Sequence, residues 1–151
     1  GIRSAHDVGW IRNLTVGKLM RTDVRTAPIS MPLDEFRKEF RLGATQRVVL
    51  VDEAGRYAGL ILLPEIYAAP REESSEPRTL AGFARYQNDV LLPTMNAKQA
   101  AAIFDATEAE ALAVVSSQSE RKVIGQLSES HLLRRYAEEL DRRRREVSGE
   151  I

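Results

Sequence analysis

The sequence contains one long unit twice, and this repeat limits the possible folds more than any other feature. A displacement of 64 positions lays residues 47–52 (RVVLVD) on residues 111–116 (ALAVVS), and both are typical of a buried strand that ends in a polar turn. After the turn the displacement becomes 66, because Gly59 falls on Gly125. The second copy therefore has a longer turn, and the chain is expected to fold as two similar units.

Each copy predicts the same order of elements: an extended segment, a helix, two strands joined by a turn, and a second helix. The extended segments are residues 25–29 and 90–93, and the last helices begin at Pro64 and Glu129. A unit of this size has too few apolar faces to cover its own small sheet, so the two units should pack together. The predicted fold class is α+β, with two repeats related by a pseudo-two-fold axis and a three-stranded sheet in each.

The composition and the motifs exclude several kinds of function. The 22 basic and 22 acidic residues cancel, so no overall field attracts nucleic acid, which is not an expected partner. The absence of cysteine rules out disulfides and thiolate chemistry, and with only two histidines we expect no metal site. No glycine-rich phosphate loop or nucleophile elbow appears, so we expect no enzyme activity. No apolar run approaches the roughly 20 residues of a membrane-spanning helix.

The two repeats, each with a glycine before its last strand and a helix directly after it, resemble the tandem cystathionine-β-synthase (CBS) domain, or Bateman module. This resemblance covers residues 14–136. Three stretches are also similar to the cytoplasmic C-terminal region of bacterial ClC-type chloride channels and transporters. They are residues 14–24 (LTVGKLMRTDV), 40–61 (FRLGATQRVVLVDEAGRYAGLI) and 133–146 (LRRYAEELDRRRRE).

The repeat pattern and this resemblance divide the chain into five parts. They are a leader (1–13), a first CBS repeat (14–68), a linker (69–78), a second CBS repeat (79–136) and a charged helical extension (137–151). The linker contains two prolines with charged residues and serines, a composition that does not pack as a core.

CBS repeats that bind adenine nucleotides carry the pattern G-h-x-[ST]-x-x-D, in which the hydroxyl contacts phosphate and the aspartate holds the ribose hydroxyls. In the first copy Gly59 fits this pattern, but Leu62 replaces the hydroxyl residue and Glu65 stands at the place of the aspartate. The alternative explanation of Glu65 is local, because an acid at the front of a helix is favoured by the helix dipole without any ligand.

In the second copy Gly125 and Ser128 fit the pattern, and His131 stands at the place of the aspartate. A neutral imidazole has one acceptor nitrogen and cannot hold two ribose hydroxyls as a carboxylate can, so His131 is equally expected as an ordinary surface residue. Ser128 and the start of the last helix offer donors to phosphate, but a serine here is also a preferred helix N-cap. Arg47, before a buried strand, either approaches a phosphate or stays solvated.

The arginine-rich end of the chain is interpreted as a solvated helix held by ion pairs. Three acids each stand four residues before an arginine, an order that stabilises helices. The expected pairs are Glu138–Arg142, Glu139–Arg143 and Asp141–Arg145. The expected apolar stripe consists of Leu132, Leu133, Tyr136, Ala137 and Leu140. Contact with a membrane face or a partner subunit is the alternative.

Three functional hypotheses follow from the resemblance. The first is a regulatory module on the cytoplasmic side of the cell membrane, attached to the transmembrane part of a ClC-type chloride channel or transporter, which modulates gating and binds ATP, ADP or AMP as a possible ligand. The second is a dimerisation scaffold without a ligand, which the incomplete motifs favour. The third is a sensor module of a soluble enzyme or of another transporter.

The resemblance also implies a homodimer. The first helix of each copy, expected at residues 33–41 and 97–105, has apolar residues around much of its circumference, more than one small sheet should cover. In CBS proteins such helices meet their counterparts in a second module. The interface residues expected here are Phe36, Phe40, Ala101, Ala102 and Phe104.

Overall fold

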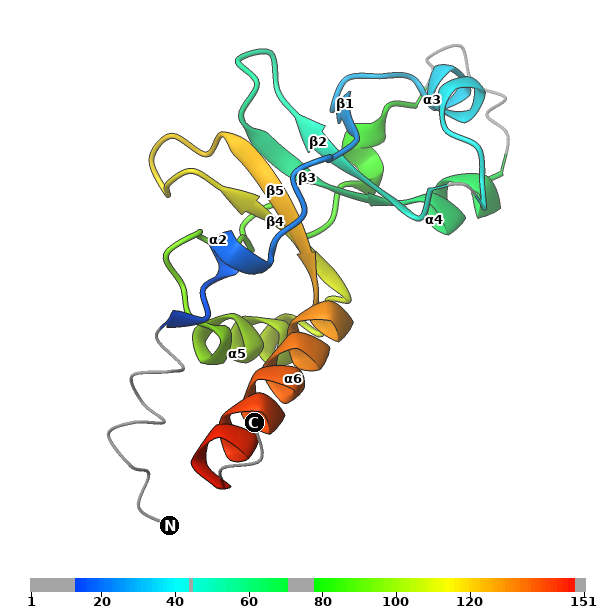
Figure 1. The fold of residues 1–151 in the computed structure, drawn as a ribbon. Helices are drawn as coiled ribbons and strands as arrows, with labels where there is room; N and C mark the ends of the chain where they lie inside the picture. Colours follow the sequence, from blue (N-terminus) through cyan, green and yellow to red (C-terminus); the bar gives the residue numbers. More distant parts are fainter. Residues whose placement is uncertain (1–12, 44, 71–77, 149–151) are drawn as a thin grey trace.

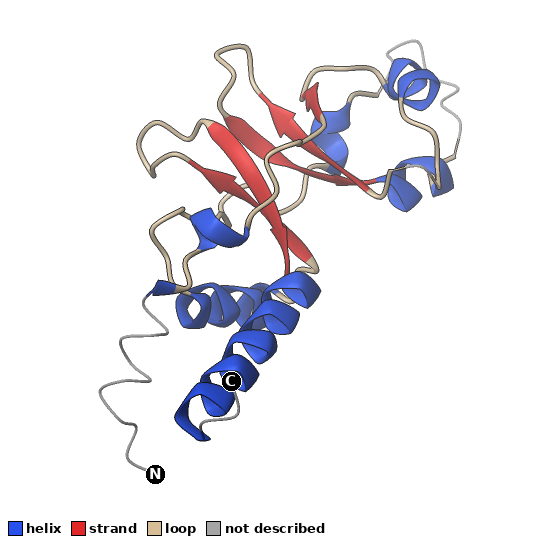
Figure 2. Cartoon of the chain, in the orientation of Figure 1, coloured by secondary structure: helices blue, strands red, loops and turns tan. Residues whose placement is uncertain are grey.

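The computed structural model describes residues 13–43, 45–70 and 78–148 (Figure 1). Most of the predicted leader (1–13) and of the predicted linker (69–78) lies outside these residues, as do residues 149–151 of the predicted extension. The described chain has the expected α+β fold, in which two small sheets and their helices form two similar repeats (Figure 2).

Both repeats contain the predicted helices and the predicted pair of antiparallel strands. The elements of the first repeat are β1 (Thr26–Pro28), α3 (Leu33–Glu39), β2 (Arg47–Val51), β3 (Tyr57–Leu62) and α4 (Leu63–Ala68). Those of the second are α5 (Ala97–Thr107), β4 (Ala111–Val115), β5 (Val123–Ser128) and α6 (Glu129–Ser148). Two short helical turns at equivalent positions precede them, α2 (Val16–Leu19) and η1 (Leu80–Phe83).

The strand register follows the repeat closely. Strand β2 pairs with β3 in antiparallel register with an irregularity between Leu50 and Val51, and β4 pairs with β5 with one between Val114 and Val115. These two positions are equivalent under the displacement of 64 residues. The two repeats therefore share the same local distortion of their hairpins as well as the same hydrophobic pattern.

The third strand forms fully in the first repeat only. Strand β1 pairs in parallel with β2, and the Ile29 N–H donates to the Val51 carbonyl at 2.9 Å. The equivalent segment of the second repeat keeps a single parallel bridge, Leu91 to Val114. The residue equivalent to Ile29 is Pro93, which has no N–H to donate, so the second sheet has two strands where three were predicted.

The two repeats exchange their first segments. We define the leading segments as residues 14–21 and 78–85. The first makes bridges to Asn96 and Gln126 in the second repeat, and the second makes bridges to Pro32 and Leu60 in the first. These four bridges are two equivalent pairs. The sequence repeats 14–68 and 79–136 therefore do not pack as two separate units, because the first segment of each repeat packs against the other repeat.

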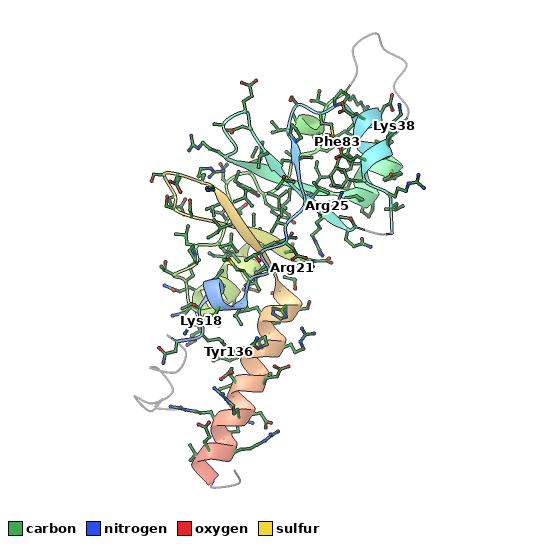
Figure 3. All side chains as sticks on the ribbon, turned by 45° about the horizontal axis from the view of Figure 1, so that its top comes forward. Lys18, Arg21, Arg25, Lys38, Phe83 and Tyr136 are labelled. Carbon is green, nitrogen blue, oxygen red and sulfur yellow. The ribbon has the colours of Figure 1, made fainter. Side chains whose placement is uncertain are left out.

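The exchanged segments are buried in the cores that they enter. Leu14, Val16 and Leu19 belong to the larger apolar cluster, which is centred on β4, β5, α5 and α6. Leu80 belongs to the smaller cluster, around α3 and α4, with Phe83 packed against it. Figure 3 shows the same division, with Phe83 near Lys38 of α3, and with Lys18 on the side of Tyr136 of α6.

The side chains expected at a dimer interface are largely buried inside the chain itself. Phe36, Phe40 and Phe104 are exposed to 0%, 2% and 1%. These rings are therefore not left for a partner subunit to cover, because the leading segments supply the cover that one small sheet lacks. On α5, Ala101 is half-buried and packs on the larger cluster, whereas Ala102 is exposed.

Helix α6 continues without a break as far as Ser148, over the described part of the predicted extension. Its stripe buries Leu132 and packs Tyr136 and Leu140 on the larger cluster, but Leu133 is 51% exposed, so its predicted place in the stripe was wrong. None of the described helices combines the length and the apolar character needed to cross a membrane.

The ion pairs of α6 differ from the expected ones. Asp141 pairs with Arg145 as predicted. Arg142 pairs instead with Glu139 at 2.7 Å, and Glu138 approaches Arg134 and Arg135, which precede it in the sequence. Spacings of three and four residues both bring side chains together on a helix, so the order of charges alone did not decide the partners.

Gly125 provides a test of the exchange. A Cβ at this position would lie 2.5 Å from Met20 Sδ and 2.9 Å from the Arg21 carbonyl oxygen, so the leading segment would have to move. We expect Gly125→Ala to lower the free energy of unfolding by about 1–3 kcal/mol. Gly82→Ala is the control, because nothing lies within 4 Å of its added Cβ, and it should not destabilise. Urea denaturation measures both, and equal stabilities would contradict the packing described here.

Candidate functional site

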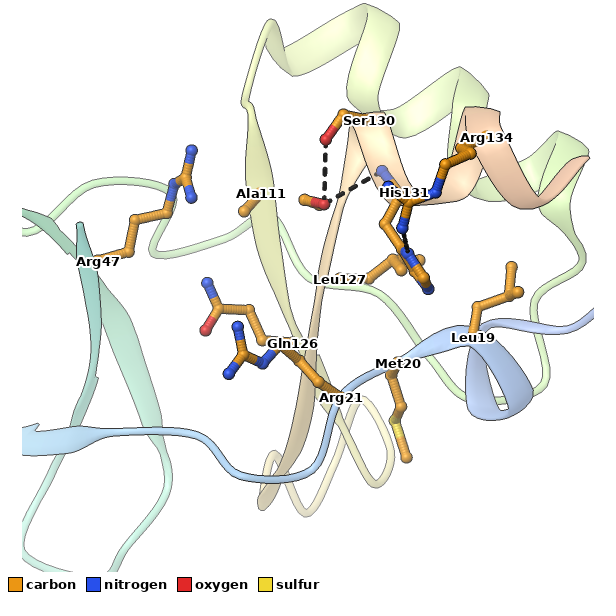
Figure 4. Close-up of a pocket in the computed structure, with 11 residues that line it drawn as sticks. Leu19, Met20, Arg21, Arg47, Ala111, Gln126, Leu127, Ser130, His131 and Arg134 are labelled. Atoms are coloured by element: carbon orange, nitrogen blue, oxygen red, sulfur yellow. Dashed lines mark hydrogen bonds between the residues drawn. The ribbon is translucent and has the colours of Figure 1, made fainter. Parts of the chain in front are cut away.

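The candidate site is a cavity of about 480 Å³ between the first leading segment, strand β5 and the start of helix α6 (Figure 4). Arg47, at the start of β2, reaches it from the first repeat. The lining residues are Leu19, Met20, Arg21, Arg47, Ala111, Gln126, Leu127, Ser128, Ser130, His131 and Arg134. The volume lies within the range of small-molecule sites.

Backbone pairing holds one wall of the cavity. The Arg21 N–H donates to the Gln126 carbonyl at 3.0 Å, and the Gln126 N–H donates back to the Arg21 carbonyl at 3.0 Å. This close approach requires glycine at position 125, where a side chain would meet the segment. The glycine of the nucleotide motif therefore has a structural function here, which is to bring Arg21 to the cavity.

Ser128 caps helix α6. Its Oγ accepts a hydrogen bond from the His131 N–H at 3.2 Å, the geometry expected of an N-cap. The Glu129 N–H donates to the Glu110 carbonyl at 2.9 Å. Two of the first three helix N–H groups are therefore already used, and the helix start has less to offer a phosphate than the sequence suggested. The Ser128 hydroxyl can still donate its own hydrogen to a ligand.

His131 is held by its neighbour on the same helix. The Arg134 Nη2 lies 2.8 Å from His131 Nδ1. A guanidinium can only donate, so Nδ1 accepts and the ring carries its hydrogen on Nε2. His131 therefore offers the cavity an N–H donor, whereas the aspartate that it replaces would offer two acceptor oxygens.

Arg47 is not a simply solvated side chain, which corrects that alternative. Its side chain is 24% exposed, and its Nη2 donates to Glu110 Oε2 at 2.8 Å. Glu110 precedes β4, so this ion pair joins the two repeats near the starts of the equivalent strands β2 and β4. Glu110 does not line the cavity, and the Arg47 guanidinium does.

The lining of the cavity is cationic. Arg21, Arg47 and Arg134 contribute guanidinium groups, and no carboxylate lines the cavity within the described part of the chain. Arg21 also forms two hydrogen bonds to the exposed Asp23 at 3.1 Å, and this bonding raises the pKa of Arg21. The arrangement favours an anionic ligand, because these three groups line one cavity and the acids that pair with them do not line it.

The equivalent place in the first repeat is arranged differently. Arg85 is the counterpart of Arg21, and it pairs with both carboxylate oxygens of Glu65, the counterpart of His131. Leu62 stands there in place of Ser128. The sites of the two repeats have thus diverged: Arg85 is bound to the carboxylate at the motif position, whereas Arg21 is bound to Asp23, which does not line the cavity.

The structure brings together three of the four residues that the motif suggested. Arg47, Ser128 and His131 line one cavity, while Glu65 lies outside it, beside Arg85. Arg21 and Arg134 were missed. Arg21 could have been found from the repeat, because a displacement of 64 positions lays it on Arg85, whereas nothing in the sequence pointed to Arg134. Among the described residues, no three histidine or acidic side chains gather as a metal site.

Comparison with known proteins agrees with this geometry. Residues 16–72 match the family model described as CBS domain. No curated protein sequence gave a significant match. This sequence match lies in the first repeat and the residues that follow it, and it covers less than half of the chain.

Solved structures extend the likeness to both repeats. The CBS domain of the bacterial CNNM/CorC family Mg²⁺ transporter in complex with ATP is 14% identical over 85% of this chain and 90% of its own, with a TM-score of 0.69. CBSX2 from Arabidopsis thaliana, in its complex with AMP, is 18% identical over 83% and 97%, with a TM-score of 0.68. The cytosolic domain of the Mg²⁺ channel MgtE in complex with ATP is 21% identical over 80% and 48%, with a TM-score of 0.64. The fold is that of a CBS pair.

The pair between Glu65 and Arg85 can be measured. Both side chains are partly exposed and their contact is bidentate, so we expect a coupling energy of about 0.5–1 kcal/mol in a double-mutant cycle of Glu65→Gln and Arg85→Gln. Urea denaturation of the two single variants and the double variant provides the energies. Additive effects would show that this pair does not contribute to the stability of the protein.

Proposed function

We propose that this chain, which has the fold of a CBS pair, is a regulatory module that binds one adenine nucleotide in the cavity beside β5 and α6. The observation that carries this proposal is that three arginines and, among the described residues, no carboxylate line a cavity of about 480 Å³. Charge-assisted hydrogen bonds from arginine are well suited to phosphate. The neighbours solved with ATP or AMP support the choice of an adenine nucleotide.

The arrangement of the lining suggests how a ligand would act. Arg47 comes from the first repeat, whereas His131 and Arg134 come from the second, and Arg21 belongs to the exchanged segment between them. A nucleotide that contacts all of these groups would bind best when the repeats have one relative position. It would therefore shift the population toward that position, and this differential affinity is what regulation requires.

We further propose that the module serves a membrane ion transporter and lies on the cytoplasmic side of its membrane. Two of the similar structures are parts of Mg²⁺ transport proteins, which supports a transporter in general. The ClC-type anion channel or transporter remains the specific candidate, supported by the three similar stretches of sequence. The sequence that precedes residue 1 in the full protein would decide between them and a soluble enzyme.

Assembly as a homodimer belongs to the same proposal. Because the rings of α3 and α5 are buried within the chain, the contact surface would involve the exposed side of α5, which carries Ala102 and Ala106 one helical turn apart. Small side chains at this spacing allow two helices to approach each other closely. A stable two-fold interface should bury about 1,000 Å² or more in total.

Calorimetric titration with ATP, ADP and AMP tests nucleotide binding. We expect one site per chain with a micromolar dissociation constant. Arg21→Ala should weaken binding by about tenfold or more, because a charge-assisted hydrogen bond contributes roughly 1.5–3 kcal/mol. Arg85→Ala is the matched control, since Arg85 is the counterpart of Arg21 outside the cavity, and should bind as the wild type does. An absence of binding heat up to millimolar nucleotide concentrations would instead favour the dimerisation scaffold without a ligand.

Sedimentation equilibrium tests the dimer. The wild-type chain should be dimeric at ~100 μM, a concentration above the micromolar dissociation constants of modest interfaces. Ala102→Glu should give folded monomers, because it places a charge on the exposed side of α5. A wild-type chain that remains monomeric at this concentration would rule out the proposed assembly.

A further inference from the structure

The cationic groups of the cavity lie at two separate ends. Figure 4 shows Arg47 on one side of Ser130 and Gln126, and His131 with Arg134 on the other side. Arg21 lies between them, beside Gln126. A ligand with a single anionic group can satisfy only one end, so this arrangement fits a molecule that carries negative charge at two separated points.

The groups at the end formed by His131 and Arg134 are donors. Arg134 has only N–H donors, and its bond to Nδ1 leaves His131 with a hydrogen on Nε2. The acids that pair with the arginines do not add acceptor oxygens to the lining of the cavity. Asp23, Glu110 and Glu138 pair with Arg21, Arg47 and Arg134 respectively, and none of these acids lines the cavity.

Because His131 and Arg134 offer only hydrogen-bond donors, their end of the cavity does not favour a ribose with two free hydroxyls. The two hydroxyls of a diol are recognised well by a carboxylate, which accepts from both, whereas a cationic donor at the same place accommodates a phosphate on the ribose. Nucleotide-binding folds that use an acid for the ribose hydroxyl and an arginine for a ribose phosphate follow this rule. Here Glu65 retains the acid in the first repeat, while the second repeat has a histidine and an arginine at its cavity.

We infer that the cavity selects a nucleotide that carries a phosphate on its ribose, at the 2′ or 3′ position, in addition to its 5′-phosphate. One phosphate lies at the end formed by Arg47, and the other at the end formed by His131 and Arg134, with Arg21 between them. This inference rests on the proposed nucleotide binding and specifies its ligand class.

Two isomers of adenosine diphosphate distinguish the effect of where the phosphates are attached from the effect of the total charge of the ligand. Adenosine 3′,5′-bisphosphate and adenosine 2′,5′-bisphosphate carry their phosphates at two points, whereas ADP carries both at the 5′ position. We expect at least one of the bisphosphates to bind about tenfold more tightly than ADP in calorimetric titrations at the same salt concentration. A merely cationic cavity would bind all three alike or prefer ADP, and that result would overturn the inference while nucleotide binding stands.

Variants at the same end give a second readout. Arg134→Gln should reduce the ratio of ADP to bisphosphate dissociation constants to about one, and His131→Asp should reverse it, because a carboxylate repels phosphate and accepts from the diol. Arg85→Ala should leave the ratio at its wild-type value. Thermal denaturation identifies any variant that fails to fold, and Arg134→Gln, at a largely exposed side chain, is the safer of the two.

Different experimental results would contradict the inferred ligand class and the proposed nucleotide binding. A ratio that stays above ten in Arg134→Gln would show that the preference arises elsewhere and would overturn the assignment to this end. If ATP, ADP, AMP and both bisphosphates all produce no heat, the nucleotide proposal itself is wrong, and the inference is wrong with it.

Discussion

The exchange of leading segments is the constraint on which the rest of this molecule depends. Residues 14–21 complete the core of the second repeat, and residues 78–85 complete that of the first. Neither repeat can bury its helices without the other, because the apolar residues that cover them belong to a different part of the chain. The same exchange forms one wall of the cavity, since it brings Arg21 against β5.

Much of the fold could be predicted from the sequence because it repeats. The displacement of 64 positions located the equivalent strands, and the helices expected at residues 33–41 and 97–105 correspond to α3 and α5. The exchange could not be predicted, since the hydrophobic pattern of a segment shows that it is buried but not which core receives it. The expectation of uncovered phenylalanine rings failed for this reason.

The site was predictable to the extent that it lay in a motif. Ser128 and His131 follow the glycine of the pattern at fixed spacing, and a motif of this kind identifies positions along one strand and one helix. It does not identify side chains that arrive from elsewhere in the fold, such as Arg21, nor the direction of the hydrogen bond between Arg134 and His131. That direction follows from the chemistry of guanidinium once the distance is known, and it changes what the site can recognise.

The reciprocal arrangement of the leading segments has the topology of a domain-swapped dimer whose two copies have been joined end to end. Two identical copies of one repeat could exchange these segments in the same way, and they would then have two identical sites. A single chain is free of that symmetry, because a substitution alters one copy and not the other. Duplication followed by fusion would thus allow one ancestral pocket to become an internal ion pair, as at Glu65 and Arg85, while its twin remained an open cationic cavity.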